Sequence, residues 1–270
     1  MKLEKNIEVI PGSPNTLVYD SRIVIDQGGR NANLQLSAEV QIATHGHGDH
    51  IAGLTKYAKI KYLPREEYWT LNLIGRRALT YSFSSSSDSQ VFTYDFIKDN
   101  IEPQGSLPSE IEEIKLPGHT PGHVGYIVGG KVLYAGDAFF GNKVIENFVI
   151  PYYIDIGKGI ESLETIKEIS KSVDYIVIAH GPTYDNKNKL LSIVEFNIEH
   201  LHKLMEKVKE MIRDKERSVE EIIIRLLTEA NKEVTAPSIV LDSITIKSIL
   251  IYLNAEPIII NEGLKWKLHK

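Results

Sequence analysis

The chain of 270 residues contains no cysteine. Disulfide bonds, thiolate zinc sites and cysteine nucleophiles are therefore excluded, and any bound metal must be held by nitrogen and oxygen atoms. The chain also lacks an uncharged apolar run long enough to cross a bilayer, and its first residues, Met1–Asn6, carry no apolar signal core. We therefore expect a cytoplasmic protein with no membrane partner.

An excess of positive charge is missing as well. The 31 Lys and Arg residues are outnumbered by 36 Asp and Glu residues, which gives a net charge of −5. Because binding to nucleic acid relies on a basic surface, we do not expect a nucleic-acid partner. A hydrophobic content of 42% and a charged content of 25% are typical of an ordinary globular protein. The length fits one large domain or two.

What the chain does contain is a dense group of histidines in Thr44-His45-Gly46-His47-Gly48-Asp49-His50, directly after the apolar run Val40–Ala43. This stretch places three imidazoles and one carboxylate within six residues. A solvated polar loop is the alternative interpretation. Neutral imidazole and carboxylate are ligands of Zn, Mn and Fe, so a metal site is the simplest reason to gather them.

Three further segments place a histidine or an acid at the end of an expected strand. They are Gly118-His119, Gly136-Asp137 and Ala179-His180-Gly181. Each alone is a weak signal, because a single histidine or aspartate at a strand end is often structural. In layered α/β folds, however, functional groups gather where strands end in loops. These segments are therefore candidates for the ligands that the histidine stretch lacks.

The order of expected elements indicates a layered α/β fold. Strands are expected at Ile7–Ile10, Leu17–Tyr19, Arg22–Asp26, Lys59–Leu63, Ile111–Leu116, Val124–Val128, Lys131–Ala135 and Asp174–Ala179, and helices at Ile51–Ala58, Arg65–Leu79 and Ser162–Ser170. The paired glycines of Asp26–Arg30 fit a plain loop better than a phosphate loop, because their spacing matches neither phosphate-binding pattern. The serine-rich stretch Tyr81–Ser89 is either a lid or an inert surface loop.

The composition changes near residue 190, which predicts a metal-binding catalytic domain at 1–189 and an accessory domain at 190–270. Helices are expected at Leu190–Asp214, from Ser218 to about Ala230, and at Ser243–Leu253, followed by a hairpin of Pro257–Ile260 and Leu264–Leu268. This order is typical of a winged-helix module. Because residues 191–270 hold 13 acidic and 12 basic residues, we favour a structural or dimerising role over DNA binding.

On the four motifs Thr44–His50, Gly118-His119, Gly136-Asp137 and Ala179-His180-Gly181, the chain resembles the metallo-β-lactamase superfamily over roughly residues 7–185. The resemblance implies an αββα sandwich with metals at one edge, between two sheets. It also implies the ligands of two metal ions. Metal 1 would be held by His45, His47 and His119, metal 2 by Asp49, His50 and His180, and Asp137 would bridge them.

Within that superfamily, Gly118–His123 and the run that follows Gly136-Asp137 look most like glyoxalase II and related thioester hydrolases. The tail is similar instead to the β-lactamase-like protein 2 group. It does not resemble the glyoxalase II domain that grips glutathione, which argues against a glutathione thioester substrate.

The resemblance implies a hydrolase with two divalent metal ions, Zn foremost, with Fe or Mn left open. Such metals share a water molecule and lower its pKa, so that a metal-bridged hydroxide attacks the substrate. We expect cleavage of a small ester, thioester or lactone, with Asp49 as the catalytic residue that holds or steers the hydroxide's proton. The alternatives are a persulfide dioxygenase with one iron held by His45, His119 and Asp137, and, less favoured, a metal-dependent nuclease.

Several side chains near the motifs have two interpretations each. Phe139, Phe140, Tyr152 and Tyr153 either wall an apolar pocket or pack in the core. His123 either orients a ligand or a loop, or is simply structural, and Tyr184 is a candidate hydrogen-bond donor to the site. His200, His202 and His269 are expected to be packed or solvated. The sequence leaves open which small molecule is the substrate, which metals bind, and whether the chain forms a homodimer.

Overall fold

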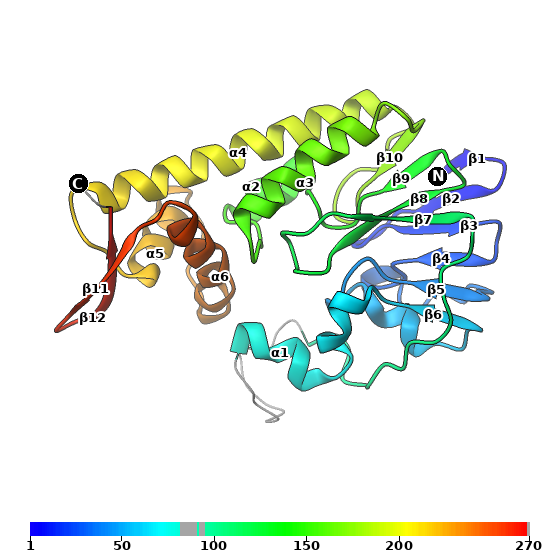
Figure 1. The fold of residues 1–270 in the computed structure, drawn as a ribbon, viewed down its shortest axis with the longest axis horizontal. Coiled ribbons are helices and arrows are strands. Elements are labelled where there is room, and N and C mark those ends of the chain that lie inside the picture. Colours follow the sequence, from blue (N-terminus) through cyan, green and yellow to red (C-terminus); the bar gives the residue numbers. More distant parts are fainter. Residues whose placement is uncertain (82–90, 92–94, 269–270) are drawn as a thin grey trace.

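The computed structural model describes residues 1–81, 91 and 95–268. The described strands form two sheets that face each other and a separate hairpin (Figure 1). The first sheet contains, in spatial order, β1 (Lys2–Glu4), β2 (Ile7–Ile10), β3 (Thr16–Tyr19), β4 (Ile23–Ile25), β5 (Val40–Ile42) and β6 (Ile60–Tyr62). The second contains β10 (Tyr175–Val177), β9 (Val132–Tyr134), β8 (Val124–Val128) and β7 (Ile111–Lys115). The predicted lid or loop at Tyr81–Ser89 falls, from residue 82 on, outside the described residues, as does His269.

An apolar core lies between the two sheets. Leu17 and Ile42 of the first sheet pack with Tyr126 and Tyr134 of the second, and all four are buried. Antiparallel pairing dominates, but β4, β5 and β6 run parallel, as do β9 and β10. The carboxyl ends of β4 and β5 therefore meet at one edge of the first sheet, and those of β9 and β10 meet at one edge of the second.

Helices cover the outer face of the second sheet, and a 3-10 helix with neighbouring loop residues packs on the first. On the second sheet lie α2 (Asn142–Phe148), α3 (Ile156–Ile169) and the long α4 (Lys187–Arg213) (Figure 1). On the first sheet a smaller cluster packs around Ile51, Leu54 and Leu63. The predicted layered α/β fold is confirmed. Among the described residues, no helix is both long enough and apolar enough to span a membrane.

Two helices predicted near the histidine stretch are wrong in detail. The expected helix at Ile51–Ala58 is a short 3-10 helix, Ile51–Thr55. The expected helix at Arg65–Leu79 is interrupted, with a 3-10 helix at Arg65–Thr70 and α1 at Leu73–Tyr81. The interruption has a local cause, because the side chain of Asn72 accepts a hydrogen bond from the Gly75 N–H at 2.8 Å and so starts a new helix.

The C-terminal elements follow the predicted order. After α4 come α5 (Val219–Glu229), α6 (Ala236–Tyr252), β11 (Glu256–Ile260) and β12 (Gly263–Lys267). The capping box predicted at Ser218 and Glu221 is present. The third helix begins at Ala236 rather than Ser243, because Thr235 caps it and Pro237 lies in the first turn, where proline is tolerated.

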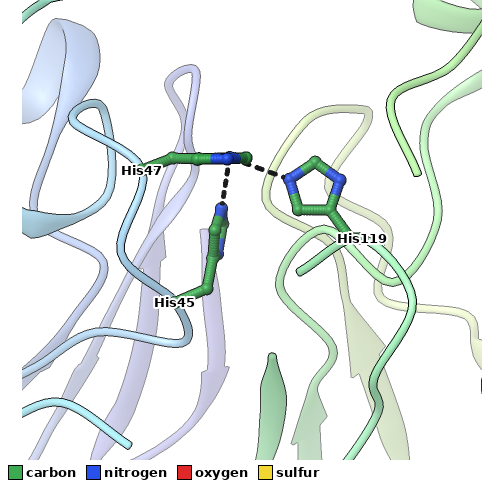
Figure 2. Close-up of side chains that lie close together, drawn as sticks. All are labelled: His45, His47 and His119. Atoms are coloured by element: carbon green, nitrogen blue, oxygen red, sulfur yellow. Dashed lines mark hydrogen bonds between the residues drawn. The ribbon is translucent and has the colours of Figure 1, made fainter. Parts of the chain in front are cut away.

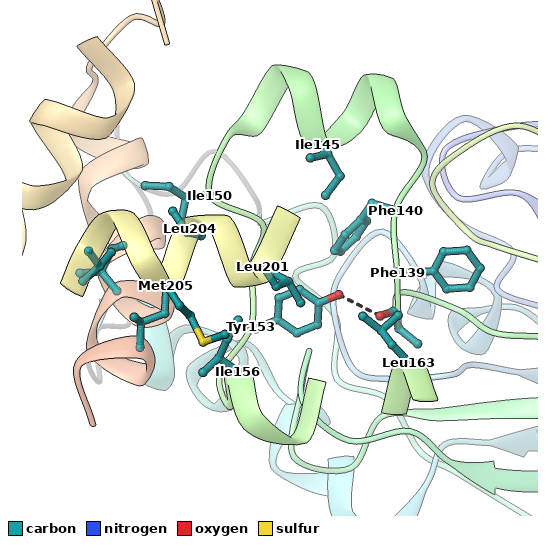
Figure 3. Close-up of a cluster of buried hydrophobic side chains, with 14 of the residues drawn as sticks. Phe139, Phe140, Ile145, Ile150, Tyr153, Ile156, Leu163, Leu201, Leu204 and Met205 are labelled. Carbon is teal, nitrogen blue, oxygen red and sulfur yellow. Dashed lines mark hydrogen bonds between the residues drawn. The ribbon is translucent and has the colours of Figure 1, made fainter. Parts of the chain in front are cut away.

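One continuous core joins these C-terminal helices to the second sheet. Figure 3 shows Leu201, Leu204 and Met205 of α4 gathered with Ile150 and Tyr153. Buried residues of α5 and α6 belong to the same cluster. The segment from residue 137 to 156 therefore lies between the second sheet and the C-terminal helices.

Candidate metal centre

The structure brings all seven predicted ligand residues to the edge where the two sheets meet. Each follows a strand. Thr44–His50 follows β5, and the other segments follow β7, β9 and β10. The candidate ligands form three overlapping groups whose donor atoms lie within 4.8 Å of one another: His45, His47 and His119; His45, His50 and Asp137; and Asp49, His50 and His180. The turn needs Gly46, since an added Cβ would lie 1.9 Å from Oγ1 of Thr70.

The first trio consists of His45, His47 and His119, whose rings point towards one another (Figure 2). Nδ1 of His47 lies 3.0 Å from Nε2 of His45 and 3.0 Å from Nε2 of His119. Burial lowers the pKa of His47 to about 3 and that of His119 to about 4, and it lowers the pKa of His45 well below its usual value. All three imidazoles are therefore neutral at physiological pH.

The outer nitrogens of two of these rings determine which nitrogen faces inward with a lone pair. Nδ1 of His119 lies 2.8 Å from the Tyr152 carbonyl, which can only accept, so Nδ1 carries the proton. The Thr44 hydroxyl donates to the Asp26 carboxylate, so it accepts from Nδ1 of His45 at 3.0 Å. Both Nε2 atoms thus present lone pairs to a shared point, as a metal cation requires.

The second trio, Asp49, His50 and His180, lies beside the first. Nε2 of His180 is 3.2 Å from Nε2 of His50 and 3.2 Å from Oδ2 of Asp49. The outer nitrogens are again engaged, because Nδ1 of His50 donates to Asp26 at 2.8 Å and Nδ1 of His180 lies 2.7 Å from the Ser13 hydroxyl. The inner Nε2 atoms are turned towards the carboxylate of Asp49.

Asp137 lies between the two trios. Its Oδ2 is 3.4 Å from Nε2 of His50, 3.4 Å from Nε2 of His119 and 3.5 Å from Nε2 of His180. Although burial opposes ionisation, His180 and His50 hold the pKa of Asp137 well below its usual range. Its buried Oδ1 has no hydrogen-bond partner among the described residues. A buried carboxylate with an unpartnered oxygen amid inward-facing imidazole nitrogens fits a pair of metal cations.

Sequence reasoning missed Asp26, which it placed in a plain loop. The side chain is fully buried, and it accepts hydrogen bonds at 2.8 Å from the Thr44 N–H, the Thr44 hydroxyl and Nδ1 of His50. Asp26 therefore orients the histidine stretch from behind. The available signal was its place directly after a strand, the same signal that identified Asp137.

Glu67 was missed for a different reason, because it was read as part of a helix. One carboxylate oxygen accepts from the Gly46 N–H at 3.0 Å and the other from the Gly122 N–H at 2.7 Å. Burial raises the pKa of Glu67, while these hydrogen bonds oppose the rise. The side chain ties the loop that carries His45 and His47 to the loop that carries His119.

His123 positions a ligand residue rather than joining the cluster. It donates from Nδ1 to the Leu116 carbonyl at 3.0 Å, and its Nε2 accepts from the backbone N–H of Asp137 at 3.0 Å. Tyr184 packs against the helical core with Nζ of Lys189 5.1 Å from its ring centroid. It is not among the described residues that line the cleft over the metal centre.

A cleft of about 520 Å³ opens directly over this cluster. His47, Asp49, His119, Asp137 and His180 form its floor. Of the four aromatic residues predicted as wall or core, Phe140 and Tyr152 line the cleft. Phe139 and Tyr153 are buried in the core, and the Tyr153 hydroxyl donates to the Ala138 carbonyl at 2.8 Å (Figure 3).

Polar side chains of the C-terminal helices hold the segment that carries Asp137 and Tyr152. The side-chain amide of Asn197 of α4 accepts a hydrogen bond from the Phe140 N–H at 3.0 Å and donates one to the Phe140 carbonyl at 2.7 Å. Thr245 of α6 donates to the Pro151 carbonyl at 3.0 Å and accepts from the Tyr153 N–H at 2.9 Å. Because Tyr152 holds Nδ1 of His119, α6 supports the first trio through one intervening residue.

Comparisons with known proteins show what this chain is similar to. The family model of the metallo-beta-lactamase superfamily matches residues 42–199. A beta-lactamase-like protein 2 homolog from Caenorhabditis elegans is 23% identical over 214 residues, which cover 78% of this chain and 63% of that protein. A hydroxyacylglutathione hydrolase from Prochlorococcus marinus is 30% identical over 181 residues, which cover 60% of this chain and 63% of that protein. The chain thus spans just under two thirds of the length of these relatives.

A solved structure extends the likeness of the fold over the whole chain. A metallo-beta-lactamase family protein from Thermus thermophilus superimposes with a TM-score of 0.68 at 15% identity, covering 99% of this chain and 100% of that one. The family model, the two relatives and the mixed α/β fold confirm the resemblance predicted from the four motifs. The chain belongs to the metallo-β-lactamase superfamily.

Proposed function

We propose that the seven clustered residues hold two divalent metal ions, with zinc the first candidate. His45, His47 and His119 would hold one ion, Asp49, His50 and His180 the other, and Asp137 would bridge the two. The support is the pair of adjacent trios with Asp137 between them. Because the chain has no cysteine, the donors are limited to nitrogen and oxygen atoms. Such donors suit Zn, Mn and Fe alike, so they do not decide which metal binds.

We propose that the chain is a hydrolase of a small ester, thioester or lactone. When bound, two such ions supply an activated water and a Lewis acid that polarises the scissile carbonyl. The residues supply orientation and proton handling. Although burial alone would raise the pKa of Asp49, the neighbouring His50 and His180 lower it to about 2, so this carboxylate is ionised and would orient the attacking water by accepting a hydrogen bond from it. Its side chain is 24% exposed and faces the cleft, where a substrate would enter.

The relatives support the reaction class and leave the substrate to be tested. One of them is named as a hydrolase of hydroxyacylglutathione. We do not propose that substrate for this chain, because the chain spans only part of the relative and its own tail supplies part of the wall of the cleft. We propose instead that the substrate is selected by residues of this chain's own α6.

The dioxygenase alternative would use one iron held by His45, His119 and Asp137. Such a site leaves Asp49, His50 and His180 without a use, although their inner nitrogens and the Asp49 carboxylate lie 3.2 to 3.7 Å from one another. This second convergent group favours two metals and therefore hydrolysis. A nuclease is disfavoured by the acidic overall charge.

Metal analysis combined with activity tests these proposals. Protein stripped of metal and reloaded with Zn, Mn or Fe would be assayed against esters, thioesters and lactones, with metal content measured by mass spectrometry. We expect about two ions per chain and hydrolysis that disappears with the metals. About one iron per chain with oxygen uptake would establish the dioxygenase instead, and the absence of metal-dependent turnover across the panel would overturn the hydrolase.

We further propose that residues 190–270 form a winged-helix-like accessory unit. The order of three helices and a hairpin supports this, and its role would be to brace the segment from 137 to 156 rather than to bind nucleic acid. A cytoplasmic location and a homodimer stay predictions of the sequence.

A further inference from the structure

The walls of the cleft above the metal centre are mainly apolar. They are formed by Trp69 and Phe96 on one side, Ile145 and Phe148 of α2, and Pro237 and Leu241 of α6. The first turns of α6 therefore line the same cleft as the candidate metal ligands, and α6 also packs against α1, which lies next to it in Figure 1. The substrate space is shared between the two halves of the chain.

The charged groups in these walls do not form an anion site. Arg76 does not offer its guanidinium to a ligand, because it already donates to the carbonyls of Thr70, Ile97 and Asp99 at 2.6, 2.9 and 3.0 Å. Lys232 lines the cleft together with two carboxylates, Glu233 and Asp242.

Asp242 in particular makes this wall unsuited to a negative charge. Burial raises the pKa of Asp242 to about 7, as expected for a carboxyl held against apolar surroundings. A ligand that ended in a carboxylate would lose hydration against apolar side chains and would be repelled by Asp242 once that residue ionises. An uncharged apolar group meets neither obstacle, and its transfer from water to the cleft is favourable.

We propose that the cleft between the metal centre and α6 binds an uncharged, elongated apolar acyl group. The enzyme would then prefer medium-chain acyl esters, thioesters or lactones over acyl groups that end in a carboxylate. The preference in hydrolysis rests on the proposed function. The binding of the apolar chain does not, because the walls that bind it hold no metal ligand.

The first test uses 4-nitrophenyl esters with the metal-loaded protein. Acetate, butyrate, hexanoate and octanoate esters would be compared by kcat/KM, together with the mono-4-nitrophenyl ester of adipic acid, which matches hexanoate in chain length but ends in a carboxylate. We expect kcat/KM to rise about two- to fourfold per added CH₂ group and to fall for the adipate ester. A flat series, or an adipate ester cleaved as well as hexanoate, would overturn the proposal.

Two variants locate the selectivity in the cleft. Phe148→Ala removes a wall residue that is 55% exposed, and Leu241→Trp fills the space beneath α6. Each is expected to lower kcat/KM for octanoate by about tenfold and to leave acetate within about twofold. Ile251→Trp is the matched control, because Ile251 also lies on α6, is 64% exposed and does not line the cleft. An equal loss in Ile251→Trp would contradict the assignment.

A binding measurement separates this inference from the hydrolase itself. The chain has two tryptophans: Trp69 lines the cleft, whereas Trp266 is buried in the core and is not among the described residues that line the cleft. In a Trp266→Phe background without metal, N-octylacetamide should change Trp69 fluorescence saturably, and N-ethylacetamide should not. Saturable binding without ester turnover would retain the apolar cleft and reject the hydrolase. Turnover without chain-dependent binding would reject the cleft and retain the hydrolase.

Discussion

Nδ1 of His50 donates to a carboxylate oxygen of Asp26 at 2.8 Å, and both side chains are fully buried. The same carboxylate accepts two hydrogen bonds from Thr44, so all its partners are donors. In Asp26→Asn, either orientation of the amide sets an N–H against one of them. We expect metal affinity to fall by about 10- to 100-fold, because the residue that orients a ligand is lost.

Chelator competition followed by mass spectrometry measures this loss of affinity. Asp20→Asn is the control, since Asp20 is exposed at the end of β3 and its neutralisation changes the net charge equally. Equal metal affinity in the Asp26→Asn protein and the wild type would mean that Asp26 does not orient His50.

Replacing His47 tests how the ligands are divided between the metals. Its Nδ1 is the atom that meets both His45 and His119, so His47→Ala should empty the first site preferentially and leave about one ion per chain. The exposed His202→Ala is the control and should retain both ions. If His47→Ala kept both metals at full occupancy, the division of ligands would be wrong.

Thr245 tests whether α6 braces the segment from 137 to 156, which carries Asp137 and Tyr152. Thr245→Val keeps the shape of the side chain but removes the donor to Pro151 and the acceptor for Tyr153. Because both backbone groups are then left buried and unpaired, we expect a loss of about 1–3 kcal/mol in the free energy of unfolding. Urea denaturation measures it.

Metal content in the same variant reports whether the bracing reaches His119. We expect a weaker first site in Thr245→Val, since Tyr152 lies between the two released backbone groups. The control is Thr228→Val, at an exposed position of α5. A stability loss with unchanged metal affinity would confine Thr245 to a packing role.

Asp242 predicts a dependence of stability on pH. Its pKa is raised by burial from 3.8 to about 7 in the folded protein, so between these values the folded state binds more protons than the unfolded state. Stability contributed by the protonated carboxyl is therefore present below about pH 4 and is lost as the pH rises towards 7.

The variant Asp242→Asn should remove the loss of stability that the wild type shows as the pH rises towards 7. We expect urea unfolding at about pH 4 and about pH 8 to show that the free energy of unfolding of the variant increases, relative to that of the wild type, as the pH rises. The exposed Glu233→Gln, also on the cleft, should show no such gain. Parallel pH profiles for Asp242→Asn and the wild type would contradict the raised pKa.

The sequence was most informative where the chemistry is local or repeated. The four residues His45, His47, Asp49 and His50 are neighbours in the chain, so their clustering is visible before folding. The other three candidate ligands, His119, Asp137 and His180, are distant from one another in the sequence, but each follows a strand, and strand ends converge in a layered α/β fold. That regularity made the three segments candidates, and the resemblance to the metallo-β-lactamase superfamily implied the full set of seven residues.

The side chains that support the site were harder to predict from the sequence. Asp26 and Glu67 act on loops that approach them only in the folded chain, and no spacing in the sequence links Glu67 to both Gly46 and Gly122. The break before α1 depends on a single cap by Asn72. The role of Thr245 depends on how α6 docks, which composition and periodicity do not specify.

The arrangement of α6 also bears on how this protein could diverge. Pro237, Leu241 and Asp242 in its first turns line the cleft, whereas Thr245 and Ser248, further along, hold the backbone near His119. Substitutions in the first turns would therefore alter which acyl group the proposed cleft accepts, while the anchoring positions would keep the candidate metal ligands in place.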